Sequence, residues 1–459
     1  MSTAGQFERI EDKVEYYLQN IEKRDKVIKA FIEVFSEEAL ETARKLDLKA
    51  KNQKGNKNLG LLFGKVFAIK NNICIKGKRI TCSSKMLENY KAPYNATVIN
   101  DIIREGGIII GSTNMDEFAC GSDCSYSAFF PTRNPIDTEL VPGGSSGGSG
   151  AAVAAEFCDY ALGSDTGGSV RCPAAFCGIY GMKPSYGTVS RYGLVDMAMS
   201  LDQIGPLARD LDSLENVMKV IAHPDPNDDM CRHRIDYRTV KKPRFAVVKE
   251  FIESIDPEIK ERTEEIIQEL KKYYDVSIVS IPILKYGISI YYLCMCAELS
   301  SALQKFDGLK YGLRADIRKD LEIAVSEVRG IGFGKEIKRR IIVGTYITMS
   351  ENRDAWYARS LAARKTIREE FEKIFKLFDA VIGPTVPIFP WKLGEKISPI
   401  HMYQTDVLTV SANLAGIPAI SVPIKGLKLP AGIQVHAGFL KEGVMFQCAR
   451  IIKEIADRH

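Results

Sequence analysis

The chain has 459 residues, of which 45% are hydrophobic and 26% charged, as in a globular protein with a full core. Its formal net charge of +5 is small beside 63 Lys and Arg and 58 Asp and Glu residues, so composition does not indicate a nucleic-acid-binding protein. The N-terminal residues lack a signal-peptide core and no apolar run is long enough to span a membrane, so we expect a cytoplasmic protein without membrane association.

The 11 Cys residues are scattered through apolar segments, which predicts reduced and mostly buried thiols. Two pairs, Cys120/Cys124 and Cys294/Cys296, come nearest to metal-ligand spacing. None of the five His residues follows either pair at a zinc-binding distance. We therefore expect no metal site.

The first predicted elements are helices, because residues 7–47 have helical periodicity and Ser36 has the position of a helix N-cap. From 60 to 210, short apolar runs alternate with Gly, Ser and Asn clusters. A polar, Pro-bearing segment at 222–243 is expected to be a surface excursion. A strand–helix–strand unit follows it, residues 286–376 are mostly helical, and the end returns to strands and a closing helix.

This order predicts an α/β fold with a central mixed, mostly parallel sheet that helices cover on both faces. We expect one large domain over residues 1–459, with residues 60–210 as its core. The reason is that strand-like segments near both ends of the chain could share one sheet.

Two Gly-rich segments carry the strongest functional signal, namely VPGGSSGGSGAAVAAEF at 141–157 and LGSDTGGSVRCPAAFCG at 162–178. Such segments let backbone N–H groups approach a ligand. Neither has the Lys of a phosphate-binding Gly-x4-Gly-Lys-Ser/Thr loop. A dinucleotide site would need an acidic residue about 20 positions on; Asp165 lies at about that distance from Gly144, but within the second Gly-rich loop. Nucleotide binding is therefore disfavoured.

Two other interpretations remain open for these segments. Residues 143–147 match the G-x-S-x-G nucleophile elbow, with His401 and His436 as candidate bases, although Pro142 makes a poor strand end. A purely structural role, in which small residues let helices pack closely, is the third possibility. Two Ser-rich loops so near each other in the chain make that role less favoured.

Three segments together resemble the amidase signature enzymes: GKVFAIK ending at Lys70, GGSSGGS at 143–149, and GSDTGGSVRCPA at 163–174. The resemblance covers nearly the whole chain and is most specific in its central third. It implies a single amidase-signature domain and a Ser-Ser-Lys site with Lys70, Ser145 and Ser169 as catalytic residues.

The chemistry of such a site follows from the residue types. A serine hydroxyl is a weak nucleophile until a base removes its proton, and Lys70 can be that base only when neutral. Burial in the apolar run VFAIK would lower the pKa of Lys70, because desolvation disfavours the charged amine. Ser145 can both accept and donate a proton, so it could carry the proton from Ser169 to Lys70.

The resemblance also assigns residues around this triad. It implies a cis peptide bond at Ser145 and an oxyanion hole formed by backbone N–H groups. The residues implied are Thr166, Gly167, Gly168 and Ser169 for the oxyanion hole and Ser146, Asp165 and Arg171 for support of the loops. The sequence departs from the family pattern near the base, with Val66 in place of Pro and Asn71 in place of Asp, which leaves the tuning of the lysine open.

Outside the signature, residues 111–122, 332–350 and 402–423 are similar to the glutamine-hydrolysing subunits of tRNA-dependent amidotransferases. This similarity implies L-glutamine as the substrate and Arg340 and Asp406 as partners of its α-carboxylate and α-amino group. Tyr291 would line the same pocket. The loop 121–127 departs from the usual pattern of these subunits because its Glu is missing.

The similarity further implies a complex with two other subunits, one large and one small. It assigns no cofactor to this chain, places ATP and Mg²⁺ in a partner, and implies that tRNA is contacted mainly through that partner. Two alternatives remain. The chain could be a stand-alone amidase that acts on small amides, or it could be a catalytically inactive scaffold. The presence of Lys70, Ser145 and Ser169 together disfavours the inactive scaffold.

Overall fold

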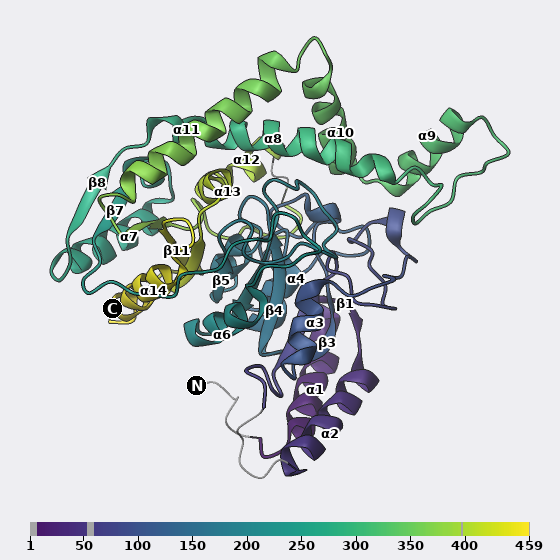
Figure 1. Ribbon diagram of the computed structural model, residues 1–459, viewed down its shortest axis with the longest axis horizontal. Helices are drawn as coiled ribbons and strands as arrows, with labels where there is room; N and C mark the ends of the chain where they lie inside the picture. The colour runs from purple at the N-terminus through teal and green to yellow at the C-terminus, as the bar shows by residue number, and fades with distance from the viewer. Residues whose placement is uncertain (1–6, 53–58, 396–397, 459) are drawn as a thin grey trace.

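The computed structural model describes residues 7–52, 59–395 and 398–458, and the strands of these residues form one 11-stranded sheet (Figure 1). The strand order across the sheet is β1-β3-β2-β4-β6-β5-β10-β11-β9-β7-β8. The strands are β1 Phe31–Val34, β2 Val66–Lys70, β3 Ile108–Thr113, β4 Tyr160–Asp165, β5 Tyr180–Lys183, β6 Gln203–Ala208, β7 Phe245–Val248, β8 Val276–Val279, β9 Ala380–Pro384, β10 Ala419–Ile424 and β11 Ala431–Ala437.

Helices cover both faces of this sheet, as predicted. One apolar cluster joins the sheet to α3, α6, α7 and α14, and another joins it to α1, α2 and α4. In Figure 1, α8, α10 and α11 arch over one edge of the sheet. The α-helices are α1 Ile10–Ile28, α2 Ser36–Asn52, α3 Thr97–Arg104, α4 Gly147–Ala154, α5 Arg171–Phe176, α6 Leu211–Ile221, α7 Pro257–Lys271, α8 Gly287–Ala302, α9 Leu321–Gly332, α10 Lys335–Thr348, α11 Arg359–Ile374, α12 Pro399–Gln404, α13 Val410–Ala415 and α14 Glu442–Ala456.

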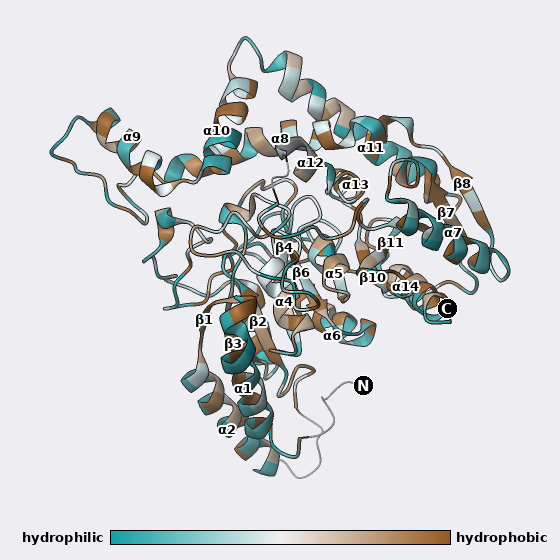
Figure 2. Cartoon of the chain, turned by 180° about the vertical axis from the view of Figure 1, so that it is seen from behind, coloured by the Kyte–Doolittle hydropathy of each residue, from teal (hydrophilic) through white to brown (hydrophobic). Residues whose placement is uncertain are grey.

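Strand β2 shows how the sequence produces this layering. Successive side chains of a strand point to opposite faces. Val66 and Ala68 accordingly lie in the cluster with α4, and Phe67 and Ile69 lie in the cluster with α3 and α6. Because both faces are buried, the strand is apolar throughout, and its brown ribbon lies among the helices in Figure 2. The alternation directs Lys70, the last residue of β2, to the α4 face.

The α/β fold with a mixed sheet is confirmed, but the prediction that the sheet is mostly parallel is wrong. Of the ten neighbouring pairs among the described strands, six are antiparallel. The reason lies in the connections: β10 and β11 are joined by the short segment 425–430, which permits only an antiparallel pair, and β4, β6, β5 and β10 also alternate in direction. Strands from both ends of the chain share the sheet, which favours the one-domain prediction.

A strand interrupts the predicted helical region at 7–47. Lys29 adopts the left-handed conformation and ends α1, after which Phe31–Val34 form β1 and pair with β3. Helix α2 begins at Ser36, within one residue of the predicted cap. The strand–helix–strand unit after 243, the helical region 286–376, the three late strands and the closing helix are all found as predicted.

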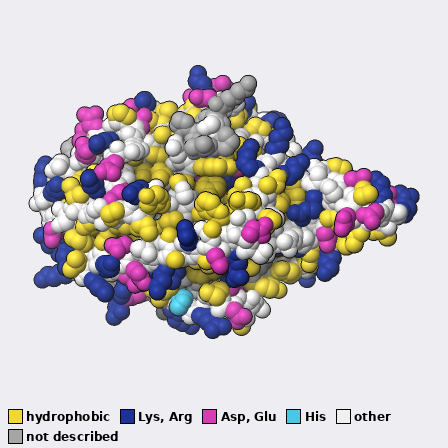
Figure 3. All heavy atoms as spheres, turned by 90° about the horizontal axis from the view of Figure 1, so that it is seen from above, with side chains coloured by type: hydrophobic (Ala, Val, Ile, Leu, Met, Phe, Trp, Pro, Cys, Tyr) yellow, Lys and Arg dark blue, Asp and Glu magenta, His cyan; other side chains and the backbone are white. Residues whose placement is uncertain are grey.

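Two segments lie outside the layered core. Residues 222–243 contain no helix or strand, and Val240 N–H donates to Gln447 Oε1 of α14 at 3.0 Å. The projection at the right of Figure 3 includes α9, and beside it α10 exposes Ile342 and Tyr346. None of the helices in the described part of the chain is both long and apolar enough to cross a membrane.

Candidate functional site

The site is built at the carboxyl ends of the parallel strands β2 and β4. Lys70 Nζ donates to Ser145 Oγ at 2.8 Å, to Ser164 Oγ at 2.9 Å and to the Ser164 carbonyl at 3.3 Å. The Lys70 side chain is fully buried. Burial lowers the pKa of Lys70 to about 8, although the charge of Asp116 opposes the shift. A substantial fraction of the amine is therefore neutral near physiological pH.

The two serines lie on adjacent segments. The Gly144–Ser145 peptide bond is cis, and the next residue, Ser146, donates its N–H to the Ser169 carbonyl at 3.2 Å. Ser169 is 8% exposed, whereas Ser145 has no exposed surface. Within the described residues the Ser169 hydroxyl has no hydrogen-bond partner, so the Lys70–Ser145 contact is formed and a Ser145–Ser169 hydrogen bond is not. Catalytic hydrogen bonds are often long without substrate.

The loop after β4 presents backbone N–H groups beside Ser169. Gly168 N–H donates to Asp165 Oδ1 at 2.9 Å, so this predicted oxyanion donor is already occupied. The N–H groups of Thr166, Gly167 and Ser169 have no partner among the described residues. A Cβ on Gly167 would come 2.6 Å from the Tyr291 ring, and Gly168 has φ of +138°, so both positions require glycine. Three of the four predicted donors therefore remain available.

A fully buried ion pair holds this loop in place. Arg171 donates from Nε to Asp165 Oδ2 at 3.1 Å and from an NH2 group to Oδ1 at 3.0 Å, and neither side chain is exposed. Burial alone would raise the pKa of Asp165, but the charge and hydrogen bonds of Arg171, with a hydrogen bond from Asn413, lower it to about 2. Ser146 anchors the other loop by donating to the Ser164 carbonyl at 3.2 Å.

The predicted carboxylate partner, Arg340, is buried on the inner face of α10. Its Nε donates to Glu336 Oε1 at 2.9 Å, and its guanidinium lies 5.2 Å from the Tyr292 ring centroid and 5.6 Å from that of Tyr403. These contacts fix the guanidinium plane. The second terminal nitrogen of its guanidinium, Nη2, has no hydrogen-bond partner in the described part of the chain. The N–H groups of this nitrogen are therefore free to bind an anion.

Asp406, the predicted partner of an amino group, is also buried. Its Oδ2 accepts one hydrogen bond, from Ser122 Oγ at 3.0 Å. Burial raises the pKa of Asp406 to about 7, with the positive charge of Arg340 opposing the shift. Tyr291 is buried against Gly167, in the loop that carries Ser169. The three predicted substrate residues therefore lie near the serine loop without forming an ion pair among themselves.

Sequence reasoning missed several polar residues that complete the site. Ser164 contacts Lys70 directly, Thr409 donates to the Gly167 carbonyl at 2.5 Å, and Asp202 accepts from the Thr166 hydroxyl at 2.6 Å. Ser164 lies inside the Gly-rich signature and could have been suspected. Nothing in the sequence singles out Asp202 or Thr409, because tertiary packing alone brings them to the loop.

Two of the three departures from the family pattern, Asn71 and the loop 121–127, form local hydrogen bonds. Asn71 donates to the Arg79 carbonyl at 3.0 Å and accepts from Thr81 N–H at 2.8 Å, so its amide uses both ends in local bonds. In the loop 121–127, Asp123 is buried and accepts hydrogen bonds from Ser125. Burial raises the pKa of Asp123, and that of neighbouring Asp116 to about 7.

Cysteines and a surface cavity lie outside this chemistry. All 11 Cys are buried free thiols, as predicted, and the described residues include no group of three or more potential metal ligands.

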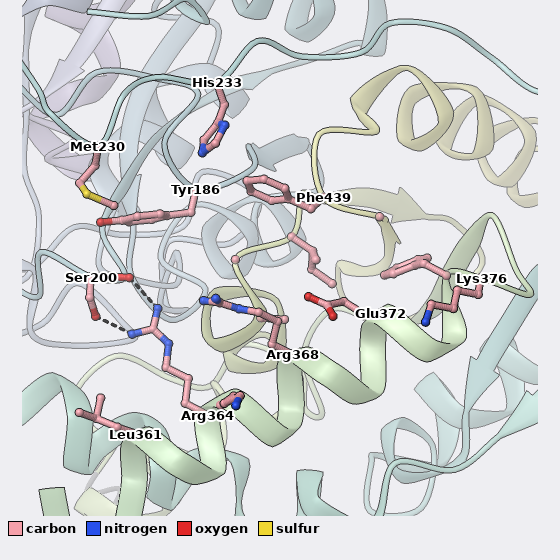
Figure 4. Close-up of a pocket in the computed structure, with 16 residues that line it drawn as sticks. Tyr186, Ser200, Met230, His233, Leu361, Arg364, Arg368, Glu372, Lys376 and Phe439 are labelled. Atoms are coloured by element: carbon pink, nitrogen blue, oxygen red, sulfur yellow. Dashed lines mark hydrogen bonds between the residues drawn. The ribbon is translucent and has the colours of Figure 1, made fainter. Parts of the chain in front are cut away.

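A cavity of about 1030 Å³ lies between α11 and loops that carry Tyr186, His233 and Phe439 (Figure 4). Arg364 spans it to Ser200, donating to Oγ at 2.6 Å and to the carbonyl at 2.7 Å. No predicted site residue lines this cavity.

Comparison with known proteins supports the sequence resemblance. The model of the Amidase family matches residues 12–445. One of the glutamyl-tRNA(Gln) amidotransferase A subunits of Clostridium acetobutylicum is 44% identical over 97% of this chain and 95% of its own length, and its counterpart in Halothermothrix orenii is 42% identical over 97% and 93%. The crystal structure of the same amidotransferase component from Thermotoga maritima superposes with a TM-score of 0.80 at 38% identity, covering 97% of this chain and 91% of that one. With its sheet, its serine loops and these matches in agreement, the chain belongs to the amidase family.

Proposed function

We propose that the chain is the glutamine-hydrolysing subunit of a tRNA-dependent amidotransferase and works through an acyl-enzyme on Ser169. The observation that carries the catalytic part is the buried Lys70 Nζ–Ser145 Oγ hydrogen bond of 2.8 Å beside the unpaired Ser169 hydroxyl. The names of its 42–44% identical relatives support the amidotransferase part.

Acylation needs the neutral form of Lys70. The Ser169 oxygen attacks the side-chain amide carbon of glutamine while its proton passes to Ser145, which gives its own proton to Lys70. The developing oxyanion accepts hydrogen bonds from the free N–H groups of Thr166, Gly167 and Ser169. When the carbon–nitrogen bond breaks, the relay returns a proton and ammonia leaves. Water then attacks the acyl-enzyme by the same relay and releases glutamate.

Recognition of glutamine would use the charged groups around the serine loop. The free part of the Arg340 guanidinium suits the α-carboxylate, and ionised Asp406 suits the α-ammonium group. Glu336 and the two tyrosine rings hold Arg340 in one orientation, so little side-chain entropy is lost on binding. Tyr291 would close the pocket against Gly167.

The remaining parts of the reaction belong to partners in this proposal. Two further subunits, one large and one small, would receive the ammonia and amidate Glu-tRNA(Gln) or Asp-tRNA(Asn) in the cytoplasm. ATP and Mg²⁺ would act in a partner, which would also make the main contact with tRNA. This chain itself would hold no cofactor.

The test is glutamine hydrolysis by the chain assembled with the subunits that co-purify with it. We expect Ser169→Ala to reduce the rate at least about 10³-fold, because removing one member of a triad disables the whole unit. Ser149→Ala is the matched control, since this buried hydroxyl bonds to Thr113 Oγ1 at 2.7 Å and has no contact with Lys70. Unchanged ammonia release by the Ser169 variant would eliminate the proposed nucleophile.

A further inference from the structure

The amine of Lys70 has three oxygen neighbours, and two of them belong to one residue, Ser164. The Ser164 carbonyl lies 3.3 Å and the Ser164 hydroxyl 2.9 Å from Lys70 Nζ, while Ser145 Oγ lies at 2.8 Å. A carbonyl oxygen can only accept, so one N–H of Lys70 must point to it. Asn72 Nδ2 donates to the same hydroxyl oxygen at 3.0 Å, and the second lone pair of this oxygen can accept an N–H of Lys70.

This arrangement favours one direction of the lysine lone pair. A neutral amine has two hydrogens and one lone pair. If both hydrogens are donated to Ser164, the lone pair can only face the remaining neighbour, Ser145. Proton transfer needs such an alignment of base and donor rather than mere proximity.

The same three oxygens also suit the protonated state. An ammonium group has three hydrogens, and each then finds an acceptor on Ser145 or Ser164. Among the described residues no carboxylate forms an ion pair with Lys70, so all three acceptors are neutral. Both protonation states of Lys70 can therefore form their hydrogen bonds without a movement of the chain. Neither state is fixed by the charge of an ion-pair partner.

We propose that Ser164 is a positioning residue that directs the lone pair of Lys70 toward Ser145. The inference rests on the proposed relay but assigns a role to a residue outside the triad. Ser164 is held for this role by β4, where Ser146 Oγ also bonds to its carbonyl at 3.2 Å and the Asn72 amide to its hydroxyl. Its action is exerted through Lys70, and it need not touch the substrate.

The test measures activation of Ser169 directly in the full chain. A fluorophosphonate probe forms a bond from its phosphorus to Ser169 Oγ and loses fluoride, while the serine proton passes through Ser145 to Lys70. Its labelling rate as a function of pH therefore reports the protonation of Lys70 and the efficiency of the relay, and it requires neither glutamine nor partners.

For Ser164→Ala we expect two changes. Loss of an acceptor disfavours the ammonium more than the amine, so the midpoint of the labelling profile moves about one pH unit lower. The plateau rate at high pH falls about tenfold, because the lone pair is no longer directed. Ser164→Thr keeps the hydroxyl and should restore both values to within about threefold. Ser149→Ala, a buried serine that bonds to the β4 carbonyl of Leu162 at 3.1 Å, should leave the midpoint in place.

The outcomes separate this inference from the proposed function. A Ser164→Ala profile with an unchanged midpoint or an unchanged plateau rate would mean that Ser164 does not orient Lys70, and it would overturn the inference. Absence of labelling at Ser169 in the unaltered chain would refute both the relay and the role of Ser164. Labelling with the expected shift in a chain whose assembled complex does not hydrolyse glutamine would leave the inference standing and reject the proposed substrate.

Discussion

Replacing Asp165 by Asn should both destabilise the protein and slow catalysis. The carboxylate accepts five hydrogen bonds: Gly168 N–H at 2.9 Å, Val170 N–H at 3.1 Å, two from Arg171 at 3.0 and 3.1 Å, and Asn413 Nδ2 at 2.8 Å. An amide of the same shape places an NH2 group against some of these donors. It also leaves Arg171 as a buried cation without its counter-charge.

The magnitude follows from the ion pair. A fall of the Asp165 pKa from 3.8 to about 2 corresponds to a preference of about 2.5 kcal/mol for the charged form in the folded state. That contribution is present above pH 3.8 and is lost as the pH falls through about 2. Removing one partner of a buried pair adds the cost of the stranded charge, so we expect a total loss of about 3–5 kcal/mol in the free energy of unfolding.

Urea unfolding of the purified chain at pH 7.5 measures this loss, and fluorophosphonate labelling measures the effect on Ser169. Glu327→Gln is the control, because Glu327 on α9 pairs with Lys319 at 2.7 Å in a bridge whose two side chains are both exposed, outside the layered core. The control should cost about 1 kcal/mol or less and leave labelling unchanged. A loss below about 1 kcal/mol for Asp165→Asn, or labelling at the unaltered rate, would refute the view that this pair shapes the oxyanion loop.

Two further outcomes follow from the site. The proposed mechanism needs a neutral amine on Lys70, whose pKa is about 8, so the rate of acylation should rise with pH and reach half its maximum near pH 8. A rate that is flat from pH 6 to 9 would contradict the assignment of Lys70 as the base. The proposed binding of glutamine needs an ionised Asp406, whose pKa is about 7, so KM for glutamine should rise as the pH falls below 7. Asp406→Asn should raise KM about tenfold or more with kcat within about threefold, measured by ammonia release, and an unchanged KM would remove Asp406 from the substrate site.

The sequence allowed much of the fold and the centre of the site to be predicted because these depend on local patterns. The apolar run before Lys70 indicated a buried strand, and burial of its last side chain follows from strand alternation. The Gly-rich loops indicated the segments that carry Ser145 and Ser169. The direction of neighbouring strands could not be predicted in the same way. Helix α5 lies between β4 and β5, the irregular segment 184–202 joins β5 to β6, and β10 follows β6 only after several other elements, so the pairing depends on the whole molecule.

The short strand β1 and the distant polar partners were missed for related reasons. Phe31–Val34 lies between two strong helical patterns, and its pairing with β3 becomes visible only when the sheet is assembled. Glu336 lies one helical turn before Arg340, so that pair could have been suspected from spacing alone. By contrast, Thr409 reaches the Gly167 carbonyl across a large sequence separation, which no local pattern records.

Burial alone does not explain why Lys70 is suited to act as a base. Lys183 is equally buried, and burial lowers its pKa to about 7. Its Nζ donates to the Pro184 carbonyl at 2.7 Å, however, and within the described part of the chain it has no hydrogen bond with a serine hydroxyl. Arg171 is also fully buried, but its guanidinium forms an ion pair with the carboxylate of Asp165 at 3.0 Å. A buried cation thus becomes a base only where its neighbours are neutral and one of them can exchange a proton. In this site Ser145 meets that condition, and in our proposal the two oxygens of Ser164 turn the lone pair of Lys70 toward it.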